Sequence, residues 1–149
     1  MTTIIRRYVE TDTGHRVPNH TSKCQHLHGH RYRFEVEVEG ETINEKGRSD
    51  EGMLIDFSDI TSILNARVHD VIDHALVLFE GDPIAKSLQS IVEPHHRIVL
   101  VPFIPTAENL AKWAYEQVEP DIIAAYNSTL KLKAMHCRET PKSWASWIP

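Results

Sequence analysis

The clearest pattern in this chain is a regular alternation of apolar and charged side chains between residues 28 and 39. Tyr32, Phe34, Val36 and Val38 stand at every second position, and the positions between them are charged. The charged positions are Arg31, Arg33, Glu35, Glu37 and Glu39. A period of two predicts an antiparallel strand with one face in the core. The charged face either meets solvent, which the pattern alone favours, or lines a polar channel.

Other segments extend this pattern into an ordered set of elements. Residues 4–17 are rich in Ile, Tyr, Val and Thr and predict a strand, residues 18–27 a loop, and residues 40–52 a turn-rich connection. Asp56 is placed to cap a helix whose apolar residues recur at helical spacing. These core-facing positions are Phe57, Ile60, Leu64, Val68, Val71, Ile72 and Ala75.

The second half of the chain predicts one more helix and a closing hairpin. Gly81-Asp82-Pro83 breaks the chain, and residues 98–101 are apolar enough for a short extra strand. A helix begins at Pro105-Thr106 with Thr106 as its cap, and Pro120 kinks or restarts it. Its core-facing positions are Leu110, Trp113, Ala114 and Val118. Residues 129–139 and 143–148 then form a hairpin around Pro141-Lys142.

The predicted order of elements is strand, strand, helix, helix, strand, strand. It indicates an α+β domain, a four-stranded antiparallel sheet with both helices on one face. A chain of 149 residues fits one domain, residues 1–149. An open sheet face and two open edges predict association into a barrel built from several subunits.

Composition narrows the class of protein. Lys and Arg total 16 against 21 Asp and Glu, so the formal net charge of −5 argues against nucleic-acid binding. No apolar run is long enough to span a membrane, and the first residues lack the apolar stretch of a secretory signal. Two Cys make a disulfide scaffold implausible, and a cytoplasmic location suits a working thiol.

Candidate chemistry is concentrated in the run Cys24-Gln25-His26-Leu27-His28-Gly29-His30. If this run enters a strand, His28 and His30 project from the same face. His15 on a neighbouring strand can supply a third nitrogen. Three protein ligands leave one position open, as in catalytic zinc sites. The thiol of Cys24 would stand beside that position.

Two simpler interpretations compete with this metal site. Ten His among 149 residues make some clustering by chance possible, and a lone His-x-His is a weak signal. A structural zinc finger built on Cys24 and His28 would need a second ligand pair, which the adjacent His136 and Cys137 do not provide. The combination of the run with His15 is more specific than any of its parts.

These residues, taken with several other segments, resemble the family of 6-pyruvoyl- and 6-carboxy-tetrahydropterin synthases, which have the tunnel fold. The match runs nearly end to end. It rests on Gly14-His15-Arg16, Cys24-x3-His28-Gly29-His30, Ile55-Asp56-Phe57, Asp73-His74 and Pro105-Thr106-Ala107-Glu108, followed by Arg138-Glu139-Thr140. The segment 81–101 is longer than the link expected between the helices.

The resemblance implies roles for particular residues. It implies Zn²⁺ bound by His15, His28 and His30. It further implies a catalytic thiol at Cys24 with Asp73 and His74 as its partners, and a pterin-binding carboxylate at Glu139. Thr106 and Glu108 match the substrate-binding Thr-x-Glu at the start of the second helix.

The resemblance also implies an activity and an assembly. Three residues between the Cys and the His-Gly-His motif, as here, accompany the bacterial 6-carboxy enzymes of queuosine and 7-deazapurine synthesis. The implied reaction is zinc-dependent conversion of 7,8-dihydroneopterin triphosphate to 6-carboxy-5,6,7,8-tetrahydropterin, releasing acetaldehyde and triphosphate. The alternatives are the 6-pyruvoyl product, dihydroneopterin cleavage for folate synthesis, and a non-catalytic zinc-binding assembly protein. Family members imply trimeric rings stacked into homohexamers, with sites at subunit boundaries.

Each proposed role has chemistry behind it and a simpler structural alternative. Cys24 needs a nearby cation to act as a thiolate base; otherwise it is a buried apolar Cys. Asp73 can orient His74 for proton transfer, but Asp-His near a helix end is often only a cap. Glu139 can accept two hydrogen bonds from a pterin, or be an exposed strand residue. Glu108 equally suits the positive end of a helix dipole.

The roles of three cationic residues and of one further imidazole are not assigned by the sequence. Arg16, Lys23 and Arg31 are all candidates to meet the triphosphate, and the sequence does not choose among them. We interpret His26 as a near-surface polar residue.

Overall fold

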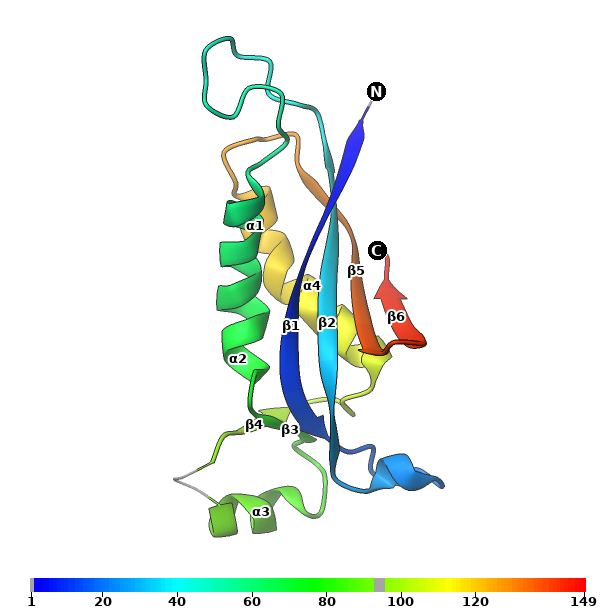
Figure 1. Ribbon diagram of the computed structural model, residues 1–149. Helices are drawn as coiled ribbons and strands as arrows, with labels where there is room; N and C mark the ends of the chain where they lie inside the picture. Colours follow the sequence, from blue (N-terminus) through cyan, green and yellow to red (C-terminus); the bar gives the residue numbers. More distant parts are fainter. Residues whose placement is uncertain (1, 93–95) are drawn as a thin grey trace.

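The computed structural model describes residues 2–92 and 96–149 and shows a curled sheet of six strands in the order β4-β3-β1-β2-β5-β6. Its long strands are β1 (Thr3–His15), β2 (His28–Gly40) and β5 (Lys131–Thr140), all joined antiparallel. The hairpin partner of β5 is β6 (Ser143–Trp147). In Figure 1, β1 and β2 run side by side, and they are paired from end to end.

One long helical segment packs against one face of the sheet and covers part of it. It comprises α1 (Phe57–Leu64), a π-helical turn η2 (Asn65–His69) and α2 (Asp70–Ile72) without a break. Asp56 caps it as predicted, its carboxylate accepting the Ser58 N–H at 2.7 Å. The predicted inward positions Ile60, Leu64, Val68 and Ile72 are buried, but Phe57 in the first turn is half exposed.

The second helix on this face is α4 (Ala107–Ile123), which lies behind β1 and β2 in Figure 1. Its predicted cap is confirmed, since Thr106 Oγ1 accepts the Asn109 N–H at 3.3 Å. Of the two expectations for Pro120, the restart was wrong, because the helix continues through this residue to Ile123. Pro120 stands in the last turn on an exposed position, where losing one backbone hydrogen bond disturbs little.

The predicted four-stranded antiparallel sheet was incomplete. β4 (Ile98–Val101) occurs where the short extra strand was expected, but β3 (Leu76–Phe79) was not predicted. Both run parallel, β3 beside the end of β1 and β4 beside β3. The predicted enlarged connection contains α3 (Ala85–Val92) between these strands. β3 was missed because it is a short apolar run that directly follows a helix, where periodicity does not separate the two.

The sheet face turned away from α1 and α4 carries the predicted charges as cross-strand ion pairs. Arg31 binds Asp12 and Arg33 binds Glu10 across β1, while Lys133 of β5 binds Glu39. Opposite charges on facing strand positions stabilise the pairing modestly. This face is therefore polar and internally neutralised.

A short 3-10 turn, η1 (Lys23–Gln25), interrupts the loop between β1 and β2. No helix among the described residues combines the length and apolar character needed to cross a membrane.

Candidate metal centre and active site

Strand register brings the three predicted imidazoles together at one end of the sheet. His15 lies directly opposite His28 in the antiparallel pair, and His30 follows on the same face of β2. Between them Gly14 faces Gly29, and a Cβ on Gly29 would stand 3.1 Å from the Thr13 carbonyl oxygen. The glycine pair thus lets the two strands approach closely where the imidazoles converge. One nitrogen from each of the three rings lies within 4.8 Å of the others.

The backbone fixes two of these rings in the tautomer that a metal needs. His15 Nδ1 donates to the Pro105 carbonyl at 2.7 Å, and His28 Nδ1 donates to the His26 carbonyl at 2.7 Å. Their Nε2 atoms are then unprotonated in the neutral rings, and they face each other at 3.1 Å. Two lone pairs this close repel unless a cation stands near them.

The third ring adds a further unpaired nitrogen. Among the described residues, His30 Nε2 is buried and has no hydrogen-bond partner. Burial lowers the pKa of His15 and of His30, which favours the neutral imidazoles that act as ligands.

These residues fit a divalent metal ion. Nitrogens on a tetrahedral zinc at about 2.0–2.1 Å lie roughly 3.3 Å apart, close to the observed Nε2 separation of 3.1 Å. Backbone partners on the second ring nitrogen are usual for metal-ligating histidines. Three nitrogen donors leave a coordination position for a substrate or water.

Glu139 points toward the same cluster from β5. Its Oε1 lies 3.5 Å from His15 Nε2 and 3.6 Å from His30 Nε2, and it accepts a hydrogen bond from the Tyr32 hydroxyl at 3.2 Å. Tyr32 is fully buried, and this burial raises the pKa of its phenol, so the hydroxyl stays a donor. Glu139 is therefore oriented inward, as a binding carboxylate requires.

A cavity of about 290 Å³ opens beside the imidazoles and contains the predicted thiol. Cys24, half buried on η1, lines it together with Glu139 and with Thr106 and Glu108 from the start of α4. The second thiol, Cys137, is fully buried in the core, and burial raises its pKa. Of the two thiols, only Cys24 lines this cavity.

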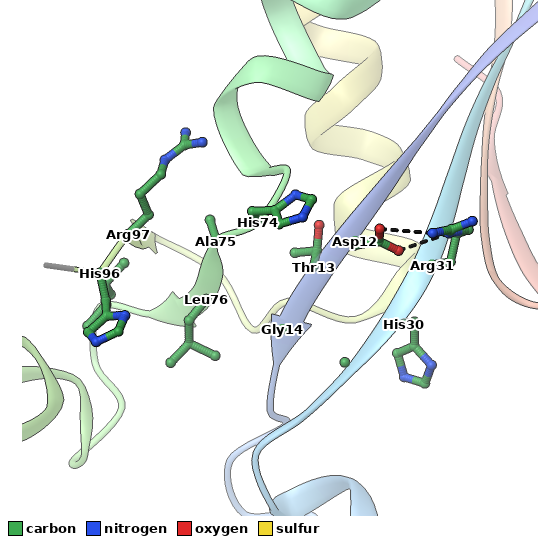
Figure 2. Close-up of a pocket in the computed structure, with 12 residues that line it drawn as sticks. Asp12, Thr13, Gly14, His30, Arg31, His74, Ala75, Leu76, His96 and Arg97 are labelled. Carbon is green, nitrogen blue, oxygen red and sulfur yellow. Dashed lines mark hydrogen bonds and ion pairs between the residues drawn. The ribbon is translucent and has the colours of Figure 1, made fainter. Parts of the chain in front are cut away.

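Asp73 and His74 form the predicted pair but face a different space. His74 Nδ1 lies 2.7 Å from Asp73 Oδ2, and Asp73 Oδ1 also accepts the Asp12 N–H at 2.9 Å. The hydrogen bonds to His74 and Asp12 outweigh the effect of burial and lower the pKa of Asp73. His74 lines a groove of about 670 Å³, to which Arg31 and His30 of the imidazole cluster also contribute. Figure 2 shows these residues around the groove. This groove shares no lining residue with the Cys24 cavity.

The candidate triphosphate residues have different surroundings. Arg16 Nε lies 2.9 Å from the buried carboxylate of Asp82, and Arg31 is bound to Asp12 by two hydrogen bonds of 2.9 and 3.0 Å. Lys23 is exposed beside Cys24. His26 has an exposed side chain, and only its carbonyl takes part in the site, through His28.

Sequence reasoning missed several contributors to the site. Tyr32 was assigned to the core, although its alternation with His28 and His30 places it on the same face. The Pro105 carbonyl orients His15 through its backbone, which a side-chain pattern does not reveal. His20 and Trp144 also line the Cys24 cavity. Trp144 follows a hairpin turn and gave no signal of its own.

Comparison with known proteins identifies the family of the chain and agrees with its fold. The chain belongs to the 6-pyruvoyl tetrahydropterin synthase family, whose model matches residues 4–148. A 6-carboxy-5,6,7,8-tetrahydropterin synthase of Rickettsia bellii is 36% identical over 78% of this chain and 80% of its own length. The protein of the same name from Haemophilus influenzae is 29% identical over 91% of this chain and 92% of its own.

Solved structures agree on the fold. An uncharacterized protein from Wolinella succinogenes superimposes with a TM-score of 0.80 at 22% identity, covering 99% of this chain and 98% of that one. The Caenorhabditis elegans 6-pyruvoyl tetrahydropterin synthase does so with a TM-score of 0.66 at 19% identity, covering 100% and 96%. At these identities, the likeness concerns the fold alone.

Proposed function

We propose that the protein is a zinc-dependent 6-carboxy-5,6,7,8-tetrahydropterin synthase. It converts 7,8-dihydroneopterin triphosphate and water to 6-carboxy-5,6,7,8-tetrahydropterin, acetaldehyde and triphosphate, a step toward queuosine and other 7-deazapurines. The observation that carries this proposal is the convergence of His15, His28 and His30, with His15 also lining the cavity that contains Cys24 and Glu139. The two curated relatives described above carry the same name.

Zinc held by His15, His28 and His30 would supply Lewis acidity toward the hydroxyl groups of the substrate side chain. The backbone carbonyls of Pro105 and His26 keep two of these imidazoles in the ligating tautomer. Among the described residues, His30 Nε2 has no hydrogen-bond partner, and this unpaired nitrogen suits a ligand role.

The remaining residues bind the pterin and move protons. Glu139, oriented by Tyr32, accepts hydrogen bonds from the amino group and ring N–H of the pterin. Thr106 and Glu108 line the same cavity and contact the ring from the start of α4. Cys24 removes a proton from the substrate side chain as a thiolate. His74, oriented by Asp73, carries a proton to or from the same carbons.

We propose that this division of labour involves more than one chain. Because the Cys24 cavity and the His74 groove share no lining residue, we propose that each active site combines Cys24 of one subunit with His74 of its neighbour. The outer edges of β1 before Gly14 and of β6 are sites for strand pairing between subunits. A homohexamer made of two trimeric rings fits this arrangement.

The activity is tested by incubating the zinc-loaded protein with 7,8-dihydroneopterin triphosphate and identifying the product by mass spectrometry. The proposal expects 6-carboxy-5,6,7,8-tetrahydropterin with equimolar acetaldehyde. A 6-pyruvoyl product without acetaldehyde would assign the chain to the activity that its family name describes. No turnover at all would contradict both activities.

The shared site is tested by subunit exchange. Cys24→Ala and His74→Ala proteins, each strongly impaired when tested alone, should recover part of the activity when they are mixed under conditions that exchange subunits. Absence of recovery despite proven exchange, or full activity in a monomer, would refute the shared site.

A further inference from the structure

The turn that carries His74 is held in an unfavourable backbone conformation. His74 has φ = +53°, the left-handed region that residues other than Gly, Asn and Asp seldom adopt. Such a conformation persists only where surrounding contacts hold it, and it is common at functional sites. The contacts around this turn therefore decide where the imidazole points.

Two hydrogen bonds fix the peptide plane between Asp73 and His74. On one side the His74 N–H donates to the Asp12 carbonyl at 2.8 Å. On the other side the Asp73 carbonyl accepts from Arg97 Nη1 at 3.0 Å. A peptide unit bonded at both its N–H and its C=O does not rotate freely, so the φ of His74 is set from both sides.

Arg97 also binds the end of the preceding helix. Its Nη2 donates to the carbonyls of Asp70 at 2.8 Å and Val71 at 2.9 Å, which are among the last carbonyls of α2. Helix ends leave such carbonyls without partners in the helix, and a cation there is favourable. One guanidinium thus joins α2 to the turn that follows it.

Arg97 lies at the end of the connection between β3 and β4, directly before β4. The Arg97 carbonyl accepts the Leu76 N–H at 2.9 Å, and the next residue begins the parallel pairing of β4 with β3. Figure 2 shows Arg97 and His74 on the same wall of the groove. The connection between β3 and β4 therefore returns to the turn that precedes β3, and Arg97 at its end supports this turn.

We propose that Arg97 is a positioning residue that holds the Asp73–His74 pair in its working orientation. The inference rests on the proposed function, in which His74 carries a proton. Arg97 has its effect through His74 and does not need to touch the substrate.

A double-mutant cycle tests this coupling. Arg97→Ala should lower kcat by about 10–100-fold, the cost of a misplaced group, with KM changed by less than about twofold and zinc content unchanged. In a His74→Ala background, the same substitution should cost less than about twofold, because its target is gone. Equal losses in both backgrounds, or no loss in the single variant, would overturn the proposal.

Two further variants serve as controls, one for correct folding and one for the general effect of removing an arginine. Arg97→Lys keeps a donor for the carbonyls and should recover part of kcat; if Arg97→Ala does not fold, the cycle is run with the lysine variant. Arg67→Ala is the matched control, since Arg67 is also an arginine fixed by hydrogen bonds, but its two bonds go to the Asp121 carboxylate of α4 and not to the turn. A kcat loss in the control as large as that in Arg97→Ala would overturn the proposal.

A readout without substrate separates this inference from the proposed function. The ring ¹⁵N signals of His74 should show one tautomer, bonded through Nδ1 to Asp73, in the unmodified protein and in Arg67→Ala. They should show a tautomer mixture in Arg97→Ala. Unchanged His74 signals would refute the positioning role, whereas a protein inactive on the pterin would refute the proposed function alone.

Discussion

The proposed metal centre is tested most directly by His30→Ala, because His30 is the proposed ligand whose removal should disturb the folded structure least. His15 and His28 each hold a backbone carbonyl, so their removal damages the protein as well as the site. His30 Nε2, in contrast, has no hydrogen-bond partner among the described residues, and its side chain is 20% exposed. Without metal, the substitution should change the free energy of unfolding by about 1 kcal/mol or less.

With metal the expected effect is large. Zinc at a free concentration of 100 times its Kd stabilises the native protein by about 2.7 kcal/mol. For a chain of this size, that corresponds to a Tm increase of roughly 5–10 °C. His30→Ala leaves two imidazoles, too few for a tight site, so the increase should vanish at the same zinc concentration.

The assay is thermal unfolding of chelator-treated protein with and without zinc, at one fixed protein concentration, together with metal analysis. His26→Ala is the matched control, because its side chain is exposed and only its carbonyl, which the variant keeps, contacts His28. The control should retain both zinc and the Tm increase. A full increase in His30→Ala would refute the ligand set, and its loss in His26→Ala would make that residue a ligand.

Three other substitutions probe residues outside the proposed ligand set. Cys24→Ala should keep zinc and the Tm increase while turnover falls by about 10²–10⁴-fold, the usual cost of losing a general base; loss of zinc would instead identify the sulfur as a ligand. Glu139→Gln should keep zinc but weaken pterin binding by about 1–3 kcal/mol, and an unchanged KM and rate would remove it from the site. Asn127→Ala should lower the free energy of unfolding by about 2–4 kcal/mol in denaturant titration without affecting zinc uptake, because its amide donates to the carbonyls of Glu41 and Leu54. A smaller loss would mean that those carbonyls find other partners.

The sequence predicted elements best where a single period runs long enough to be unambiguous. The alternation of residues 28–39 corresponds to β2, and the helical spacing after Asp56 gives the continuous helix that ends at Ile72. β3 is too short for any period, and its parallel partners lie far apart in the chain. Parallel pairing of this kind depends on tertiary contacts that no local pattern contains.

The candidate site likewise has some features that local sequence patterns predict and others that depend on tertiary contacts. The convergence of His15 with His28 follows from the register of two adjacent strands, which local patterns make readable. Carbonyls that orient imidazoles, such as that of Pro105, belong to a backbone brought close only by folding. The separation of Cys24 from His74 onto different cavities likewise needed the three-dimensional arrangement of β1 and β3.

The contrast between the two thiols gives the unmodified protein a built-in probe. Because Cys137 is enclosed in the core while Cys24 lines the cavity, an alkylating reagent should consume one thiol per native chain. The stoichiometry of that labelling counts intact sites in a preparation, and protection by bound pterin would report occupancy without any turnover. A fluorophore attached there would also sense the arrival of a neighbouring subunit.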